Sequence, residues 1–230
     1  MSSRYFFLHL QKTAGTALWQ RLNETFAPTE LYPGPGDGTP PLSTLSVPHL
    51  RERWAVREAE VRLVAGHFPL CTTELLGGGF ATFTVLREPV ERVLSGLRHY
   101  REQEPGMADV PLEEIYEDPL RQRLLRNHMV KMLSLTVDEM DDGALTDVAF
   151  TPDRLDAAVT ALRGLDVVGL QSRFDEFCAE LTARWGWDLG RPRFANRSTP
   201  AEATASFRAR IAADNADDLA LYEAAADLAV

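Results

Sequence analysis

The sequence predicts one α/β domain built on a parallel sheet, and two observations support this. Short apolar runs of strand character alternate with segments whose apolar residues recur at helical spacing. Two of the runs, residues 6–10 and 81–86, end abruptly in polar residues just before a helical segment. A chain of 230 residues with 45% hydrophobic residues has the size and core of one domain. We therefore expect residues 1–230 to form a single domain.

The first predicted element is a buried strand at residues 6–10, FFLHL, and a helix follows at residues 17–26. The turn between them has features of an anion site. Gly15 lets the backbone approach a ligand, the helix start offers free N–H groups, and Lys12 adds a positive charge. We expect the hydroxyls of Thr13 and Thr16 to serve as further donors. The predicted phosphate-binding turn consists of Gln11, Lys12, Thr13, Ala14, Gly15, Thr16 and Ala17.

This turn is not a Walker A loop. The pattern G-x-x-x-x-G-K-[ST] would need glycines at positions 7 and 11, and the chain has Phe7 and Gln11 there. The spacing therefore weakens the usual interpretation as a site for nucleoside triphosphates.

The stretch at residues 28–48 is rich in proline and glycine, which predicts a long loop without regular structure. Loops of that length are usually functional lids or disordered linkers. We expect a loop that covers a substrate, with disorder as the alternative. Residues 49–60 then predict a helix, and residues 62–66, RLVAG, predict a short buried strand.

A second apolar run, residues 81–86, follows a glycine turn and ends at Arg87-Glu88-Pro89. Pro89 suits a helix start, so the helix is expected at residues 90–100 with Ser95 two turns along it. Arg87 would then project from a strand end at the same sheet edge as Lys12.

The remaining chain predicts mostly helices. Residues 101–118 are acidic and look solvated, whereas residues 119–137 predict an amphipathic helix with a basic face. A helix opens at Thr151, and a strand at 166–170 leads to a helix at 174–185. A basic loop at 191–199 precedes an acidic C-terminal helix at 201–228.

Composition excludes several classes of function. The formal net charge of −10 argues against nucleic-acid and anionic-membrane binding. No apolar run has the length of a membrane span or a signal peptide, so a cytoplasmic protein is expected. Two distant cysteines, Cys71 and Cys178, predict free thiols, and no Cys/His spacing suggests a metal site.

Two segments, Q-K-T-A-G-T at residues 11–16 and R-E-P-V-E-R-V-L-S at residues 87–95, resemble the nucleotide-binding motifs of sulfotransferases that use 3′-phosphoadenosine-5′-phosphosulfate (PAPS). The resemblance implies a P-loop-like three-layer sandwich, a central parallel sheet flanked by helices. It also implies that the first loop, with catalytic Lys12, holds the 5′-phosphosulfate. Arg87 and Ser95, eight residues apart, would hold the 3′-phosphate, and Arg197 and Ser198 would contact the nucleotide. Gln11 and Ala14 replace a common Pro and a common Gly of the family.

His67 is the candidate general base. A histidine at a strand end has an ordinary pKa of about 6.5, which suits proton removal from a hydroxyl. Gly66-His67 also resembles a Gly-His pair of the subgroup that includes heparan sulfate 2-O-sulfotransferase, whose His is the catalytic base. A structural histidine at the end of the strand is the alternative, and His128 is the strongest rival.

The expected function is transfer of a sulfuryl group from PAPS to an acceptor hydroxyl by in-line displacement, without a metal. The expected acceptor is a small molecule, a lipid or a carrier-bound intermediate. Two alternatives stay open: a P-loop small-molecule kinase, whose metal ligand would be Glu88, and a nucleotide-binding module without catalysis. The sequence leaves the oligomeric state open.

Overall fold

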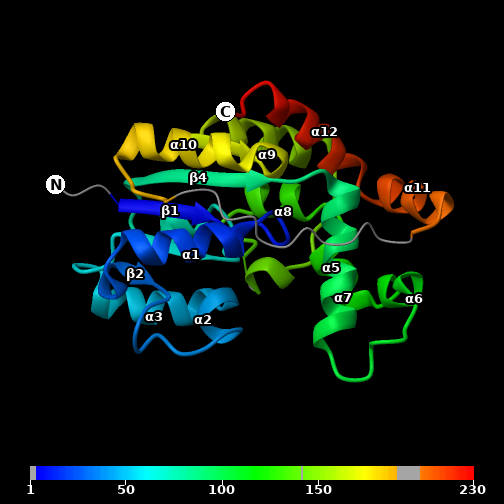
Figure 1. Cartoon of the computed structure of the whole chain (residues 1–230), viewed down its shortest axis with the longest axis horizontal. Helices are drawn as coiled ribbons and strands as arrows, with labels where there is room; N and C mark the ends of the chain where they lie inside the picture. The colour runs from blue at the N-terminus through cyan, green and yellow to red at the C-terminus, as the bar shows by residue number, and fades with distance from the viewer. Residues whose placement is uncertain (1–3, 141, 191–202) are drawn as a thin grey trace.

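The chain forms a five-stranded parallel sheet, seen in a computed structural model that describes residues 4–140, 142–190 and 203–230. The strand order is β2-β3-β1-β4-β5, and every pairing is parallel. The strands are β1 (Arg4–Leu8), β2 (Leu31–Tyr32), β3 (Leu63–Gly66), β4 (Phe80–Leu86) and β5 (Val167–Leu170). Helices flank the sheet on both faces (Figure 1). The predicted α/β fold class is confirmed.

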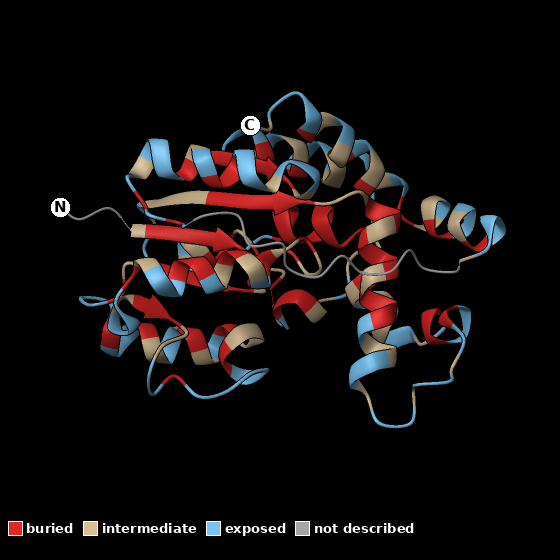
Figure 2. Ribbon diagram, in the orientation of Figure 1, coloured by how far each residue is buried: buried red, intermediate tan, exposed pale blue. Residues whose placement is uncertain are grey.

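Alternate residues of β1 pack into two different cores, as the period of two in a strand requires. Tyr5 and Phe7 face α1 (Gly15–Thr25) and α10 (Phe174–Trp185). Phe6 and Leu8 face the opposite layer. That layer is made of α3 (Val47–Arg57), α8 (His128–Ser134), α9 (Pro152–Arg163) and α12 (Ala216–Ala226). Both faces of the strands are therefore buried (Figure 2).

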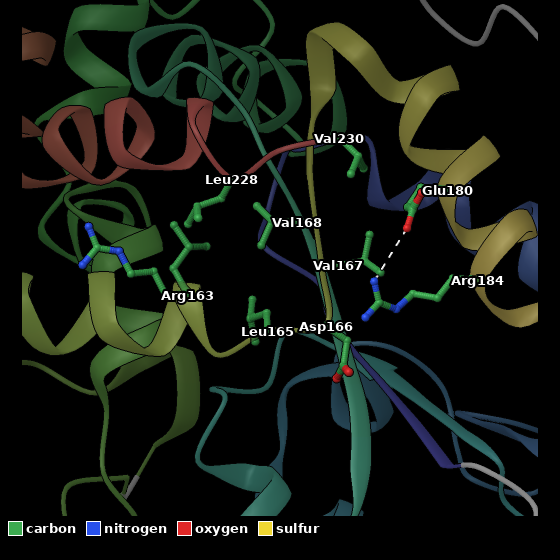
Figure 3. A pocket seen from close by; sticks show the side chains of 10 residues that line it. Arg163, Leu165, Asp166, Val167, Val168, Glu180, Arg184, Leu228 and Val230 are labelled. Atoms are coloured by element: carbon green, nitrogen blue, oxygen red, sulfur yellow. Dashed lines mark ion pairs between the residues drawn. The ribbon is translucent and has the colours of Figure 1, made fainter.

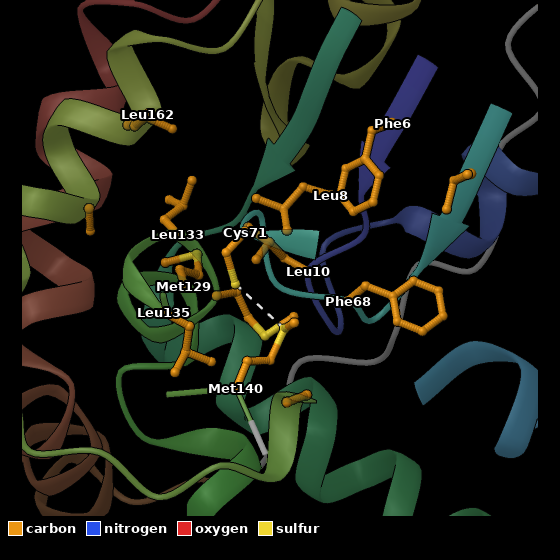
Figure 4. Close-up of a cluster of buried hydrophobic side chains, with 14 of the residues drawn as sticks. Phe6, Leu8, Leu10, Phe68, Cys71, Met129, Leu133, Leu135, Met140 and Leu162 are labelled. Atoms are coloured by element: carbon orange, nitrogen blue, oxygen red, sulfur yellow. Dashed lines mark hydrogen bonds between the residues drawn. The ribbon is translucent and has the colours of Figure 1, made fainter. Parts of the chain in front are cut away.

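The larger core lies between the sheet and α8 (Figure 4). Met129 and Leu133 of α8 pack with Leu8 and Leu10, and the Cys71 thiol lies 3.5 Å from the Met140 sulfur. Burial of such side chains is the main source of stability, at about 1.5–3 kcal/mol for each large apolar residue.

A third core lies beyond the carboxyl ends of the strands. It joins α5 (Pro89–Gln103), α6 (Leu112–Tyr116), α7 (Pro119–Leu125) and α11 (Ala205–Asp214). Figure 1 shows β1 and β4 running toward α5, with α6, α7 and α11 on the same side of the molecule. Arg92 of α5 and Asp218 of α12 form a fully buried ion pair at 3.4 Å, which ties this unit to the main layers.

The stretch at residues 28–48 is more regular than its prolines predicted. It holds the 3-10 helix η1 (Pro28–Glu30), strand β2 and helix α2 (Leu42–Leu45). The loop between β2 and α2 is anchored by Asp37, whose fully buried carboxylate pairs with Arg53 and Arg57 of α3. The expectation of a structureless stretch is wrong for residues 28–32, 42–45 and 47–48. The last two belong to α3, and β3 and α3 supply the pairing and packing that the local sequence of the others lacks.

Two predicted helices are interrupted. The expected amphipathic helix at 119–137 is divided into α7 and α8 by Arg126, which is extended, and Asn127, which has a left-handed φ of 40°. All of α8 is buried, and Lys131 donates to the carbonyl oxygens of Arg123 and Thr146. The predicted exposed basic face is therefore wrong for Lys131. The C-terminal helix is divided into α11 and α12 at Asn215, whose side chain accepts from Asn127 N.

The remaining short elements are α4 (Thr72–Leu75), η2 (Gly143–Leu145) and η3 (Gln171–Arg173). Within the described residues, no helix is both long enough and apolar enough to cross a membrane.

Candidate functional site

The sheet register brings three of the predicted site residues to one edge. Leu8 of β1 lies opposite Gly66 of β3 and Thr84 of β4. The segments that follow these three strands therefore leave the sheet side by side. They carry Lys12, His67 and Arg87, respectively.

The turn after β1 leaves the amino end of α1 open. Lys12 and Ala14 have left-handed φ values of 67° and 74°, and Ala14 is the residue that precedes the helix. No side chain of the described residues caps this helix start. The Ala17 N–H donates to the Ala14 carbonyl at 3.0 Å, whereas the N–H groups of Gly15 and Thr16 have no partner among the described residues and are available to an anion. Phosphate binding by this turn stays a prediction, and the N–H groups of Gln11 and Ala17 already have partners within the chain.

The two hydroxyls of the turn have different surroundings. Thr13 is fully buried and donates to the carbonyl oxygen of Leu10 at 2.9 Å. The expectation that its hydroxyl faces an anion is therefore wrong, because the turn uses it internally. Thr16 is exposed on the first turn of α1 and remains a candidate donor.

The Lys12 side chain lies against α5. A Cβ atom added at Gly96 of that helix would be 3.8 Å from Lys12 Cγ. Burial lowers the pKa of Lys12, nearby Arg87 lowers it further, and Glu102 opposes the shift. Among the described residues, no carboxylate lies within ion-pair distance of Lys12. Within the described part of the chain, Glu102 thus acts on Lys12 from a distance and no carboxylate pairs with it directly.

Arg87 lies beside Lys12, as predicted. Its Nη1 donates to the Lys12 carbonyl oxygen at 3.2 Å, while its buried Nε has no partner in the described part of the chain. Burial lowers the pKa of Arg87, and Glu91 opposes that effect. A partly buried guanidinium with an unused donor is suited to an anionic ligand.

Ser95 lies on α5 two turns beyond Arg87 and is partly buried. Within the described residues, no hydrogen bond joins its side chain to Arg87. The structure therefore places Ser95 on the predicted helix without showing a contact between the pair.

His67 follows β3, and its ring is held by the segment after β1. Its Nδ1 lies 2.8 Å from the carbonyl oxygen of His9. A carbonyl oxygen only accepts, so Nδ1 carries the hydrogen and Nε2 keeps a lone pair. Burial lowers the pKa of His67, the His9 carbonyl raises it, and Lys12 lowers it again. The imidazole is therefore neutral near neutral pH, as a general base must be.

His9 is a site residue that the sequence pattern missed. The apolar run placed it inside the first strand, but β1 ends at Leu8 and the His9 ring lies 4.4 Å from the His67 ring, centroid to centroid. The His9 ring also stacks on Phe7, at 5.1 Å between centroids and 12° between planes. Burial lowers the pKa of His9 well below its usual value, and His67 and Lys12 add to that effect. The polar interruption of FFLHL was the only signal in the sequence.

His128, the rival base, is fully buried in α8. Its Nε2 accepts from the Gln11 N–H at 3.4 Å, and this hydrogen bond links α8 to the turn after β1. Burial lowers the pKa of His128 well below its usual value, and Arg92 and Lys131 add to that effect. A buried acceptor for the backbone is suited to holding the turn, so His67 is the better candidate for the base.

Glu88, the predicted metal ligand of a kinase, is committed to another task. Its carboxylate accepts from the N–H groups of Val90 and Glu91 at 3.1 and 2.7 Å and so caps α5. In the part of the chain that the structure describes, no group of three or more His, Cys, Asp or Glu side chains is arranged to hold a metal ion.

Two further predicted residues, Arg197 and Ser198, lie outside the described residues. A pocket of about 180 Å³ opens elsewhere, between β5, α9, α10 and the end of the chain (Figure 3). Asp166, one of its lining residues, directly precedes β5 and accepts from Thr82 N near the beginning of β4. The pocket is therefore at the amino ends of these strands, at the edge of the sheet opposite Lys12.

The comparisons with known proteins do not assign a family. No protein-family model matches the chain, and no curated protein gives a significant match. What the fold and site define is an α/β protein with a lysine, an arginine and a histidine at the carboxyl edge of a parallel sheet, where neither cation forms an ion pair with a carboxylate of the described residues.

Proposed function

We propose that the protein is a sulfotransferase that moves a sulfuryl group from PAPS to an acceptor hydroxyl. The observation that carries the proposal is the meeting of Lys12, Arg87 and His67 at the ends of three adjacent parallel strands. Ligands of open α/β sheets bind at this edge. Two cations without carboxylate partners in the described residues, in a chain of net charge −10, favour an anionic ligand.

The side chains fit the anionic groups of PAPS. Lys12 and the open amino end of α1 would hold the 5′-phosphosulfate. Arg87, with its unused Nε, would hold the 3′-phosphate together with Ser95. Bound PAPS would supply the sulfuryl group and a phosphate leaving group.

The chain's own groups have two tasks in the transfer. His67 Nε2 would take the proton of the acceptor hydroxyl as the new S–O bond forms. Lys12 would stabilise the negative charge that gathers on the bridging oxygen as the old S–O bond breaks. The products are the sulfated acceptor, adenosine 3′,5′-bisphosphate and a proton, which His67 passes to solvent.

The acceptor that we propose is a neutral or cationic small metabolite, a lipid or a carrier-bound intermediate. A net charge of −10 disfavours a polyanionic glycan. We also propose a cytoplasmic location, which is consistent with Cys71 and Cys178 being free, buried thiols.

A titration separates this function from a kinase. Calorimetry should show binding of adenosine 3′,5′-bisphosphate without magnesium, and weaker or no binding of Mg-ATP. A preference for Mg-ATP would contradict the proposal and favour the kinase. The use of Glu88 as a helix cap counts against that outcome.

Transfer of labelled sulfate separates the enzyme from a module that only binds nucleotide. PAPS labelled with ³⁵S is incubated with the protein and a panel of hydroxyl acceptors from the proposed classes. A labelled product that disappears in Lys12→Ala but persists in Arg4→Ala supports catalysis. Arg4→Ala is a suitable control because it removes one cation at the opposite edge of the sheet, where Arg4 pairs with Glu58. Tight binding with no labelled product from any acceptor would favour the binding module.

A further inference from the structure

The ring of His67 is held by a second histidine that belongs to the segment leaving β1. The His67 Nδ1–H donates to the His9 carbonyl at 2.8 Å, and the two rings lie 4.4 Å apart with a tilt of 45°. Both contacts come from one residue. The hydrogen bond comes from the main-chain carbonyl of His9 and sets the tautomer of His67, whereas the His9 ring contacts the His67 ring and sets its plane.

His9 itself is clamped on two sides. Its ring stacks on Phe7, a fully buried residue of β1. On another side it rests on the first residue of α1, since a Cβ added at Gly15 would lie 1.8 Å from His9 Nε2. Glycine is required at position 15 because any larger residue would displace the His9 ring. The His9 ring thus lies between the first residue of α1 and the His67 ring.

We propose that His9 is a positioning residue that fixes His67 with Nδ1 protonated and Nε2 directed to the acceptor. This inference rests on the proposed function, because it assigns His67 Nε2 as the base. His9 acts through His67 and needs no contact with either substrate.

The titratable groups around His9 and His67 lower the pKa of both imidazoles. Lys12 faces both histidines from the turn, and His128 faces them from α8. A positive charge on either imidazole is disfavoured by burial and by Lys12. Among the described residues, the main-chain carbonyl of His9 opposes this by accepting from Nδ1, so it would stabilise the imidazolium that forms when His67 takes a proton.

Nitrogen NMR tests the proposal without any substrate. In the full chain, ¹⁵N shifts of His67 should show one neutral tautomer, with hydrogen on Nδ1. His9→Ala removes the ring, and Gly15→Ala keeps every charge but displaces the ring. Both variants keep the main-chain carbonyl of residue 9 but lose the clamped ring that holds this residue in place. The Nδ1–H hydrogen bond should therefore weaken, so that His67 becomes a mixture of tautomers and its pKa rises toward its usual value as water enters. The exposed His99 supplies the control, because His99→Ala removes an imidazole from the surface of α5.

Kinetics give the second test. His9→Ala should lower kcat about tenfold or more, a part of the hundredfold or more that a general base contributes, while the Kd for adenosine 3′,5′-bisphosphate changes less than about twofold. In a His67→Gln background the same change should cost nothing further. If His9→Ala fails to fold, His9→Gln is measured in its place.

The outcomes separate the two ideas. An unchanged His67 tautomer and pKa in folded His9→Ala would overturn the positioning role, even if turnover fell. Failure of the parent protein to bind the bisphosphate or to transfer sulfate would overturn the proposed function. The NMR result for His9 would be valid in either case.

Discussion

Replacement of Arg87 by Ala should separate ligand recognition from stability. The Arg87 side chain makes one hydrogen bond, to the Lys12 carbonyl at 3.2 Å, and leaves its buried Nε unpaired in the described structure. The bond is worth about 1.5–3 kcal/mol at most, because its donor is charged. Removal also relieves the burial of a cation and its repulsion with Lys12. We therefore expect the free energy of unfolding to change by less than about 1.5 kcal/mol.

The effect on binding should be larger and specific to one phosphate. An arginine bound to a phosphate makes charge-assisted and often bidentate hydrogen bonds. Its loss should weaken binding of adenosine 3′,5′-bisphosphate by about 2 kcal/mol or more, close to thirtyfold in Kd. Adenosine 5′-monophosphate lacks the 3′-phosphate, so its Kd should change much less.

Calorimetry gives the Kd of each nucleotide for the parent and for Arg87→Ala, and urea unfolding gives the free energy of unfolding of both proteins. Arg4→Ala is the matched control, because it removes the same charge at the opposite sheet edge. An equal loss of affinity for both nucleotides would refute the reasoning. So would a loss of stability above about 3 kcal/mol, which would show that Arg87 holds the fold instead.

Three further changes test other parts of the site. Ala14→Gly should leave the free energy of unfolding unchanged or raise it by up to about 1 kcal/mol, because glycine adopts the left-handed φ of 74° without strain and this offsets its greater flexibility when unfolded. Urea unfolding measures the change, and a clear loss of stability would mean that Ala14 is unstrained. His67→Ala should lower kcat about a hundredfold or more with unchanged affinity for the bisphosphate. The parent should lose activity as the pH falls through the pKa of His67, which burial places below its usual value, and the variant should lack that loss. Near-normal turnover would exclude His67 as the base. Lys131→Met tests the burial of a charge. Burial lowers the pKa of Lys131 in the folded protein to about 8, so above that pH the unfolded chain binds more protons than the folded chain does. The parent should therefore gain stability relative to the variant as the pH rises above about 8. Urea unfolding of both proteins at pH about 7 and about 9.5 measures the gain, and a constant difference would contradict it.

The main strands and the helices beside them were predictable from local pattern. The runs at 81–86 and 166–170 correspond to β4 and β5, and Thr151 and Gly186 mark helix ends through their own backbone chemistry. Parallel strands all point the same way, so residues that follow them share one edge. That rule sufficed to predict that Lys12 and Arg87 would lie at the same edge of the sheet.

Local pattern failed where distant segments supplied the stabilising contacts. β2 has only two residues, and it exists because β3 offers it a partner across the sheet. Asp37 is an ordinary loop residue in the sequence, yet α3 buries it between two arginines. Lys131 looked like part of a basic surface, although α8 is packed on every side.

The sequence by itself determined the α/β class, the order of the main elements and the edge at which the cations gather, because strand and helix periods are local properties. Only the tertiary structure decided which side chains face a ligand. Thr13 turns inward to Leu10, His128 supports the turn from the core, and His9 leaves the strand to hold His67. These outcomes depend on packing between residues that are far apart in the chain, such as His9 and His67. Periodicity carries no information about such contacts.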